Sequence, residues 1–312
     1  MGVINELDLT DNSLAFAPCV ERHELEGVEH FLTKTPYQII RDAEFLQIPT
    51  IFGFVDNEGT IRAREALENN WLQRMETSFT DFIQPDLKFD TDAEKSTIAQ
   101  QIREYYFGGN QIDMTTIGNY FRYHGDTMML VSSIREVRNR MFASQSLLYL
   151  YQFSYSGTLG EPFEGPISVE SAAHSEELAY MFYKTPVTGT PDLDHQIGDI
   201  LVERWTNFAK TSNPTSETSN VLWLPCTSLN FNYLRVLASS EIYEAGNLEV
   251  ALQNPHDQTI NFWDLIYYNY FLDAESNWEI EDDTTDSTTT TELLHSNHPQ
   301  MELPRNNHLL ME

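Results

Sequence analysis

Leu147-Leu148-Tyr149-Leu150-Tyr151-Gln152-Phe153-Ser154-Tyr155 is the stretch of sequence that decides the fold. It is apolar almost throughout, which is typical of a strand in a parallel sheet that is covered on both faces. A second run, Ile48 to Val55, is rich in β-branched and aromatic residues and ends in Asp-Asn-Glu-Gly. This pattern predicts another buried strand, followed by a tight turn.

Amphipathic segments alternate with these strands. We expect helices at Thr91–Tyr106, Thr127–Ser144, Asp194–Thr211 and Thr259–Leu272. A last short strand is predicted at Asn232–Leu237, and residues 14–50, which contain three prolines, are predicted to form loops and a short helix. The alternation of helices and strands indicates an α/β layered architecture.

The composition of the C-terminal segment differs from that of the rest of the chain. Glu279 to Glu292 is acidic and rich in threonine, so this segment cannot form a hydrophobic core. We therefore expect one folded region at residues 14–272 and a disordered acidic tail at 273–312.

Bulk properties exclude several classes of function. A net charge of −30 argues against nucleic acid and anionic membranes as partners. It could steer a cationic substrate, but solubility alone explains it as well. No run of about eighteen apolar residues is present, so no transmembrane helix is expected. The sequence also lacks Cys-x-x-Cys, His-Glu-x-x-His and a glycine-rich phosphate loop, which argues against metal and nucleotide sites.

Three features bear on the compartment. The first eight residues lack the basic and apolar regions of a signal peptide. The candidate glycosylation site at Asn213 is blocked by Pro214. Both features favour an intracellular location, although a secreted parent that is glycosylated elsewhere fits too. Cys19 and Cys226 can form one disulfide or remain two buried thiols.

Two short motifs carry candidate catalytic residues. Gly53-Phe54-Val55-Asp56-Asn57-Glu58-Gly59 places Glu58 after the first strand, and Ala172-Ala173-His174-Ser175-Glu176-Glu177-Leu178 places His174 after the second. Taken singly, a glutamate after a strand is usually a solvated turn residue, and a histidine is more often structural than catalytic.

Together the motifs resemble those of the carboxylesterase–cholinesterase family, serine hydrolases with the α/β-hydrolase fold. Trp205 to Pro214 is similar to the family's late helix and exit turn, and Phe262-Trp263-Asp264 resembles the end of the family domain. The resemblance covers residues 14–272. It implies the C-terminal part of an α/β-hydrolase, with a mixed, mostly parallel sheet flanked by helices.

The resemblance also implies a chemistry. Small carboxylic esters would be the substrates, and no metal or cofactor would be needed. His174 would be the general base and Glu58 the acid that orients it. Ser171 departs from the family's usual glycine, and Gly125-Asp126 stands where a Ser or Thr commonly precedes the aspartate. We therefore expect a differently placed histidine loop and the loss of a hydroxyl near His174.

The nucleophile that this family uses is absent from the sequence. No Gly-x-Ser-x-Gly is present, and Ser156 lacks the strand–turn–helix context that such a serine needs. We expect Met1 to be an internal methionine or a misplaced gene start, residues 1–13 to be a truncated beginning, and the predicted strands to lack their central neighbours. The isolated chain is expected to be inactive. The alternatives are a non-catalytic adhesion domain of the same fold, or a truncated chain that acts as a binder or decoy.

Overall fold

The computed structural model describes residues 20–21, 27, 29–160, 169–182 and 190–272. The chain divides into two units, Met1–Ser276 and Asn277–Glu312, and all described residues belong to the first. The predicted truncated start (1–13), the predicted tail (273–312) and Cys19 therefore lie outside the described residues. Cys226 is a buried free thiol.

The two strands expected from the sequence are present and are neighbours. β1 (Thr50–Val55) pairs in parallel with β2 (Leu148–Phe153), so that Val55 lies opposite Phe153. All six residues of β2 are buried, as its apolar sequence predicts. β1 and β2 pair directly with each other and β1 lies at the edge of the described sheet, so the expectation that central neighbours are missing stays a prediction.

Two further strands complete a mixed sheet in the order β1-β2-β3-β4. β3 (Asn232–Val236) is parallel to β2, and β4 (Glu249–Gln253) is antiparallel to β3. The prediction that Asn232–Leu237 is the last strand was therefore wrong. β4 has an apolar run of only three residues, Val250-Ala251-Leu252, and is exposed beyond Val250, so it lacks the longer apolar run by which β1 and β2 were found.

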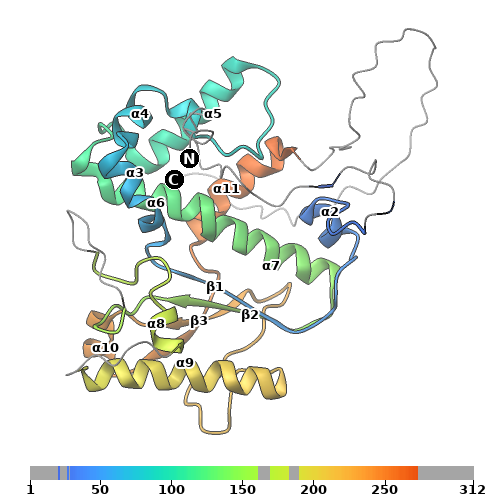
Figure 1. The fold of residues 1–312 in the computed structure, drawn as a ribbon, viewed down its shortest axis with the longest axis vertical. Coiled ribbons are helices and arrows are strands. Elements are labelled where there is room, and N and C mark those ends of the chain that lie inside the picture. The colour runs from blue at the N-terminus through green and yellow to red at the C-terminus, as the bar shows by residue number, and fades with distance from the viewer. Residues whose placement is uncertain (1–19, 22–26, 28, 161–168, 183–189, 273–312) are drawn as a thin grey trace, which may run out of the picture. The chain divides into compact units, whose positions relative to one another are not determined.

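Helices cover both faces of the sheet (Figure 1). On one face lie α6, α7 and α11, and on the other lie α8, α9 and α10. Their bounds are Ile117–Gly125 (α6), Val131–Ala143 (α7), Asp257–Tyr270 (α11), Leu178–Met181 (α8), Asp192–Thr211 (α9) and Ser239–Ala245 (α10). The remaining elements lie before α6: α2 (Pro36–Arg41), η1 (Glu58–Arg62), α3 (Ala63–Glu68), α4 (Trp71–Thr77), η2 (Phe79–Phe82), α5 (Asp92–Phe107) and η3 (Met114–Thr116).

The helix expected at Thr127–Ser144 begins earlier than predicted. α6 runs directly into a π-helical turn, η4 (Asp126–Leu130), which continues into α7. The long helical segment thus begins at Ile117. Its first part contains Gly118, Gly125 and several aromatic residues, which are weak helix formers, and packing against the turn after β1 compensates for them.

Two hydrophobic cores lie on the two sides of the sheet. One contains Phe54, Leu150 and the buried faces of α5, α6, α7 and α11. The other contains Phe153, Ile197 and Leu201. Trp205 and Phe208 of α9 are partly buried against this second core.

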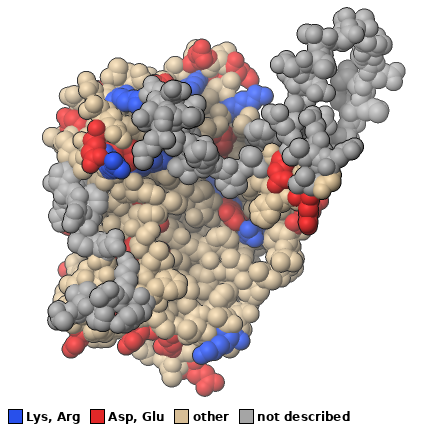
Figure 2. All heavy atoms as spheres, viewed as in Figure 1, with Lys and Arg blue, Asp and Glu red and all other residues tan. Residues whose placement is uncertain are grey.

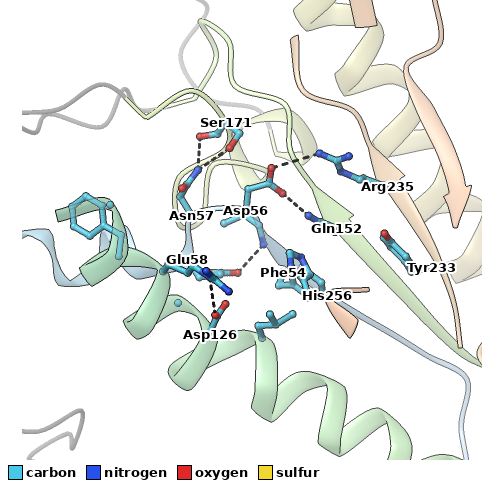
Figure 3. A pocket seen from close by; sticks show the side chains of 16 residues that line it. Phe54, Asp56, Asn57, Glu58, Asp126, Gln152, Ser171, Tyr233, Arg235 and His256 are labelled. Carbon is cyan, nitrogen blue, oxygen red and sulfur yellow. Dashed lines mark hydrogen bonds and ion pairs between the residues drawn. The ribbon is translucent and has the colours of Figure 1, made fainter. Parts of the chain in front are cut away.

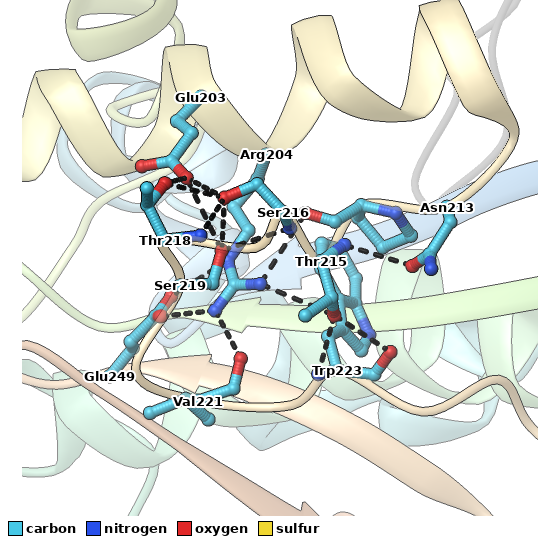
Figure 4. Close-up of polar contacts among 11 residues, drawn as sticks. Glu203, Arg204, Asn213, Thr215, Ser216, Thr218, Ser219, Val221, Trp223 and Glu249 are labelled. Carbon is cyan, nitrogen blue, oxygen red and sulfur yellow. Dashed lines mark hydrogen bonds and ion pairs between the residues drawn. The ribbon is translucent and has the colours of Figure 1, made fainter.

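A buried polar cluster joins α9 to β4 and to the loop that precedes β3 (Figure 4). Arg204 is 2% exposed and forms an ion pair with Glu249. Its guanidinium also donates to the carbonyl oxygen of Val221 at 2.6 Å. Because a buried charge is costly unless it is paired, this cluster fixes the loop to the helix and the edge strand.

Charged side chains on the face seen in Figure 2 lie mostly around the margins, and the central area carries few of them. Among the described residues, no helix is long and apolar enough to cross a membrane.

Candidate active site

The turn after β1 carries Glu58 at the start of η1, and the residue is 8% exposed. Its Oε1 accepts a hydrogen bond from the backbone N–H of Val55 at 2.9 Å. One carboxylate oxygen is thereby fixed to the end of the strand, which leaves the other to meet a partner from a distant part of the chain.

That partner is His174. Its Nδ1 lies 2.5 Å from Oε2 of Glu58, although 116 positions separate the two residues in the sequence. The His174 side chain is 28% exposed, against 10% for Glu58. Within the described part of the chain only Nδ1 of the ring has a hydrogen-bond partner, so Nε2 faces away from Glu58. The structure brings together the two residues that the sequence singled out.

Asn57 joins the two turns through its backbone and its side chain. Its N–H donates to the carbonyl oxygen of Ala172 at 2.9 Å, and its Nδ2 donates to Oγ of Ser171 at 2.8 Å. The non-glycine residue with positive φ in the histidine turn is Ser175, with φ of 66°, and not Ser171. Ser171 therefore does not adopt the positive φ that would favour glycine, and its hydroxyl supports the turn.

A hydroxyl does lie beside the histidine, but it comes from a residue that the sequence analysis missed. Thr60 accepts a hydrogen bond from the backbone N–H of His174 at 2.9 Å and donates to the carbonyl oxygen of Asn57 at 2.8 Å. The hydroxyl expected to be missing is that of position 125, where the chain has glycine, and Thr60 supplies a different hydroxyl at the backbone of His174. The signal in the sequence is the hydroxyl residue two positions after Glu58.

Helix α6 packs against the turn after β1 that carries Glu58. A Cβ on Gly59 would lie 1.8 Å from the carbonyl oxygen of Phe121, and a Cβ on Gly125 would lie 2.8 Å from the nitrogen of Gly59. Backbone therefore packs against backbone at this point, and both glycines are required by close approach rather than by an unusual φ.

A cavity of about 510 Å³ opens beside Glu58, between α6 and the carboxyl ends of the strands (Figure 3). Asp56 lies in its wall and accepts hydrogen bonds from Gln152 of β2 and Ser154, each at 2.7 Å. Arg235 of β3 donates to Ser154 at 3.0 Å. This network ties together the ends of three strands, and it leaves the cavity lined by both acidic and basic groups.

Electrostatics favour a positive charge on the histidine. The hydrogen bond that His174 donates to Glu58 raises the pKa of His174 against the opposing effect of burial, and the charges of Glu58 and Glu177 add to the increase. Burial also raises the pKa of Glu177, whose Oε1 accepts from the hydroxyl of Tyr151 at 3.4 Å. Glu177 is thus a second carboxyl group near the ring, held by a tyrosine.

Two further observations concern another candidate nucleophile and a metal site. The hydroxyl of Ser156 donates to Glu176 at 2.8 Å, so this serine is engaged away from the imidazole. Within the described residues, no group of three or more His, Cys, Asp or Glu side chains is placed to hold a metal ion.

The fold defines the class of protein. A mostly parallel sheet with helices on both faces, whose strand ends carry an acid and a histidine in that order, is typical of the α/β-hydrolase fold. The crystal structure of juvenile hormone esterase from Manduca sexta, with OTFP covalently attached, has this fold. It superimposes with a TM-score of 0.67 at 24% sequence identity, and the match covers 81% of this chain and 47% of that one.

Residues 5–263 match the carboxylesterase family, and the chain belongs to that family. A carboxylic ester hydrolase of Bombus ignitus is 25% identical over 274 residues, which are 84% of this chain and 47% of that protein. Juvenile hormone esterase of Tribolium castaneum is 25% identical over 216 residues, which are 64% of this chain and 36% of that protein. The chain therefore spans less than half the length of these relatives.

Proposed function

We propose that this chain supplies the base and the acid of a carboxylic ester hydrolase. The observation that carries the proposal is the contact of 2.5 Å between Nδ1 of His174 and Oε2 of Glu58. A carboxylate on one ring nitrogen holds the proton there, so the other nitrogen is free to act as a base. The family and the named relatives support the same reaction class.

In this mechanism His174 takes the proton of a serine hydroxyl through Nε2 while the serine oxygen attacks the ester carbonyl carbon. The tetrahedral intermediate then expels the alcohol, which receives that proton from the imidazolium. Water repeats the sequence on the acyl-serine, which releases the carboxylic acid and the free serine. Glu58 stabilises the imidazolium in both halves, and it is already held by the N–H of Val55.

The serine is proposed to come from a segment other than this sequence. The sequence contains no Gly-x-Ser-x-Gly, and Ser156 is engaged with Glu176. The relatives are more than twice as long as the region that matches, which leaves ample chain for a nucleophile and its oxyanion donors. On this proposal the chain alone is inactive, and Glu58 and His174 become catalytic once that segment is present.

The test is hydrolysis of p-nitrophenyl acetate by this chain and by a form extended with the sequence encoded in frame before Met1. We expect turnover by the extended form only. His174→Ala should lower kcat/KM of that form by about 10⁴- to 10⁶-fold, and Glu58→Gln by about 10⁴-fold. His195→Ala is the matched control, because this histidine is exposed on α9, and it should leave the rate unchanged.

Two results would contradict the proposal. Turnover that survives His174→Ala would remove the histidine from the mechanism. An extended form that folds, contains Gly-x-Ser-x-Gly and does not hydrolyse esters would favour the adhesion or decoy alternative.

A further inference from the structure

Thr60 joins two turns of the candidate active site, the turn after β1 that carries Glu58 and the turn that carries His174. It lies in η1, two residues after Glu58, and is 8% exposed. Its Oγ1 accepts from the backbone N–H of His174 at 2.9 Å and donates to the carbonyl oxygen of Asn57 at 2.8 Å. One hydroxyl therefore bonds to the backbone on both sides of the Glu58–His174 contact.

A threonine hydroxyl has one proton to donate and two lone pairs with which to accept. Here Oγ1 of Thr60 donates its proton to the carbonyl oxygen of Asn57, so one of its lone pairs accepts from the backbone N–H of His174. This direction is fixed by the partners, since a carbonyl oxygen can only accept and a backbone N–H can only donate. The two bonds therefore set the distance between the backbones of the two turns.

In the other ties between the two turns, no side chain bonds to the backbone of His174 among the described residues. Asn57 bonds to Ser171 and Ala172 and forms a parallel β-bridge with Ala173, all of which precede His174 in the chain. The contact with Glu58 is made by the imidazole ring itself. Among the described residues, Thr60 is the only side chain that holds the backbone of His174.

We propose that Thr60 is a positioning residue for His174, which fixes the histidine backbone so that the ring meets Glu58 and presents Nε2 to the nucleophile. The inference rests on the proposed role of His174 as the base. Thr60 touches neither substrate nor reacting atoms and acts only through the placement of the imidazole. Because displacing a catalytic group by about 1 Å can cost 10²-fold in rate, a single hydroxyl is sufficient for such an effect.

The first test is made on the chain as it stands, by NMR titration of the His174 imidazole. Thr60→Val keeps the shape of the side chain but removes both hydrogen bonds. We expect the His174 pKa to fall in Thr60→Val and to return to the wild-type value in Thr60→Ser. In a Glu58→Gln background, Thr60→Val should cause no further fall, because the effect acts through the contact with Glu58.

Thr215→Val is the matched control. Oγ1 of Thr215 also joins backbone groups, donating to the carbonyl oxygen of Trp223 at 3.3 Å and accepting from its N–H at 2.9 Å. This variant should lower stability and leave the His174 pKa unchanged. A His174 pKa that is the same in Thr60→Val and wild type would overturn the proposal, because it would show that the hydroxyl serves stability alone.

Two further measurements cover other outcomes. In the active extended form, Thr60→Val should lower kcat about 10- to 100-fold with little change in KM, and an unchanged kcat would overturn the proposal. If Thr60→Val does not fold, hydrogen exchange of the His174 amide in the wild-type chain decides. Slow exchange is expected, and exchange at the rate of an open loop would overturn the proposal. Failure of the proposed function is distinguished by His174→Ala, which would then leave turnover intact.

Discussion

The nitrogen of Gly59 and the Cα of Gly125 approach so closely that a Cβ at position 125 would lie 2.8 Å from that nitrogen and 3.4 Å from Cβ of Glu58. Gly125 has ordinary helical angles, φ −63° and ψ −47°, so alanine would fit its backbone. Helix propensity alone would make Gly125→Ala stabilising by up to about 1 kcal/mol. The contact predicts the opposite, a loss of about 1–3 kcal/mol through overpacking, measured by urea unfolding.

Gly118 provides the control for this prediction. It lies in the same helix, and a Cβ there would meet nothing within 4 Å. Gly118→Ala should therefore be neutral or slightly stabilising. Equal effects of the two substitutions would contradict the close contact between α6 and the turn that carries Glu58.

Arg204 is predicted to be the most costly arginine to remove. Its loss would leave Glu249, which is 9% exposed, as an unpaired buried carboxylate. We expect Arg204→Met to lower the free energy of unfolding by about 3–5 kcal/mol. The double variant Arg204→Met/Glu249→Met should be less destabilised, since no charge is then left unpaired.

Arg64 gives the comparison for the ion pair. It pairs with Glu68 on an exposed helix surface, where the two side chains are 79% and 62% exposed. Arg64→Met should change the free energy of unfolding by less than about 0.5 kcal/mol. A cost for Arg204→Met as small as this would show that the buried pair does not hold the loop.

Asp126 should make stability depend on pH. Burial raises the pKa of Asp126 to about 6, against the opposing effects of the Tyr106 hydroxyl and Arg122. A carboxyl group whose pKa is higher in the folded state contributes stability that is present below about pH 4 and is lost as the pH rises through about 6. Asp126→Asn should therefore gain stability relative to wild type between these values, by on the order of 1–3 kcal/mol.

The measurement is urea unfolding of both proteins between pH 5 and 7.5. The difference in free energy of unfolding between them should grow up to about pH 6 and then level off. A difference that stays constant across this range would mean that the carboxyl is ionised in the folded protein throughout.

The sequence was most informative where apolar runs are long. β1, β2, α5, α9 and α11 were predicted within about two residues, because each shows a continuous apolar run or a clear apolar stripe. β4 and the start of α6 were missed. The first is exposed along much of its length, and the second owes its helical form to packing against a turn far away in the sequence.

The candidate site also contains residues that the sequence singled out and contacts that it did not predict. Glu58 and His174 were singled out because their two motifs resemble those of the family, and the structure brings the two side chains together. Thr60 and the close contact of Gly125 with Gly59 were not predicted, since each depends on a contact across more than sixty positions in the chain. Such contacts follow from the pairing of β1 with β2 and from the packing of α6. A short stretch of sequence therefore does not predict them.

The coupling of Glu58 to His174 is the central claim, and titration of the His174 imidazole by NMR tests it most directly. The structure predicts a pKa above the ordinary value of about 6.5 in the wild-type chain and a lower pKa in Glu58→Gln, because the amide carries no charge to stabilise the imidazolium. A wild-type pKa at or below 6.5 that Glu58→Gln does not change would contradict the account.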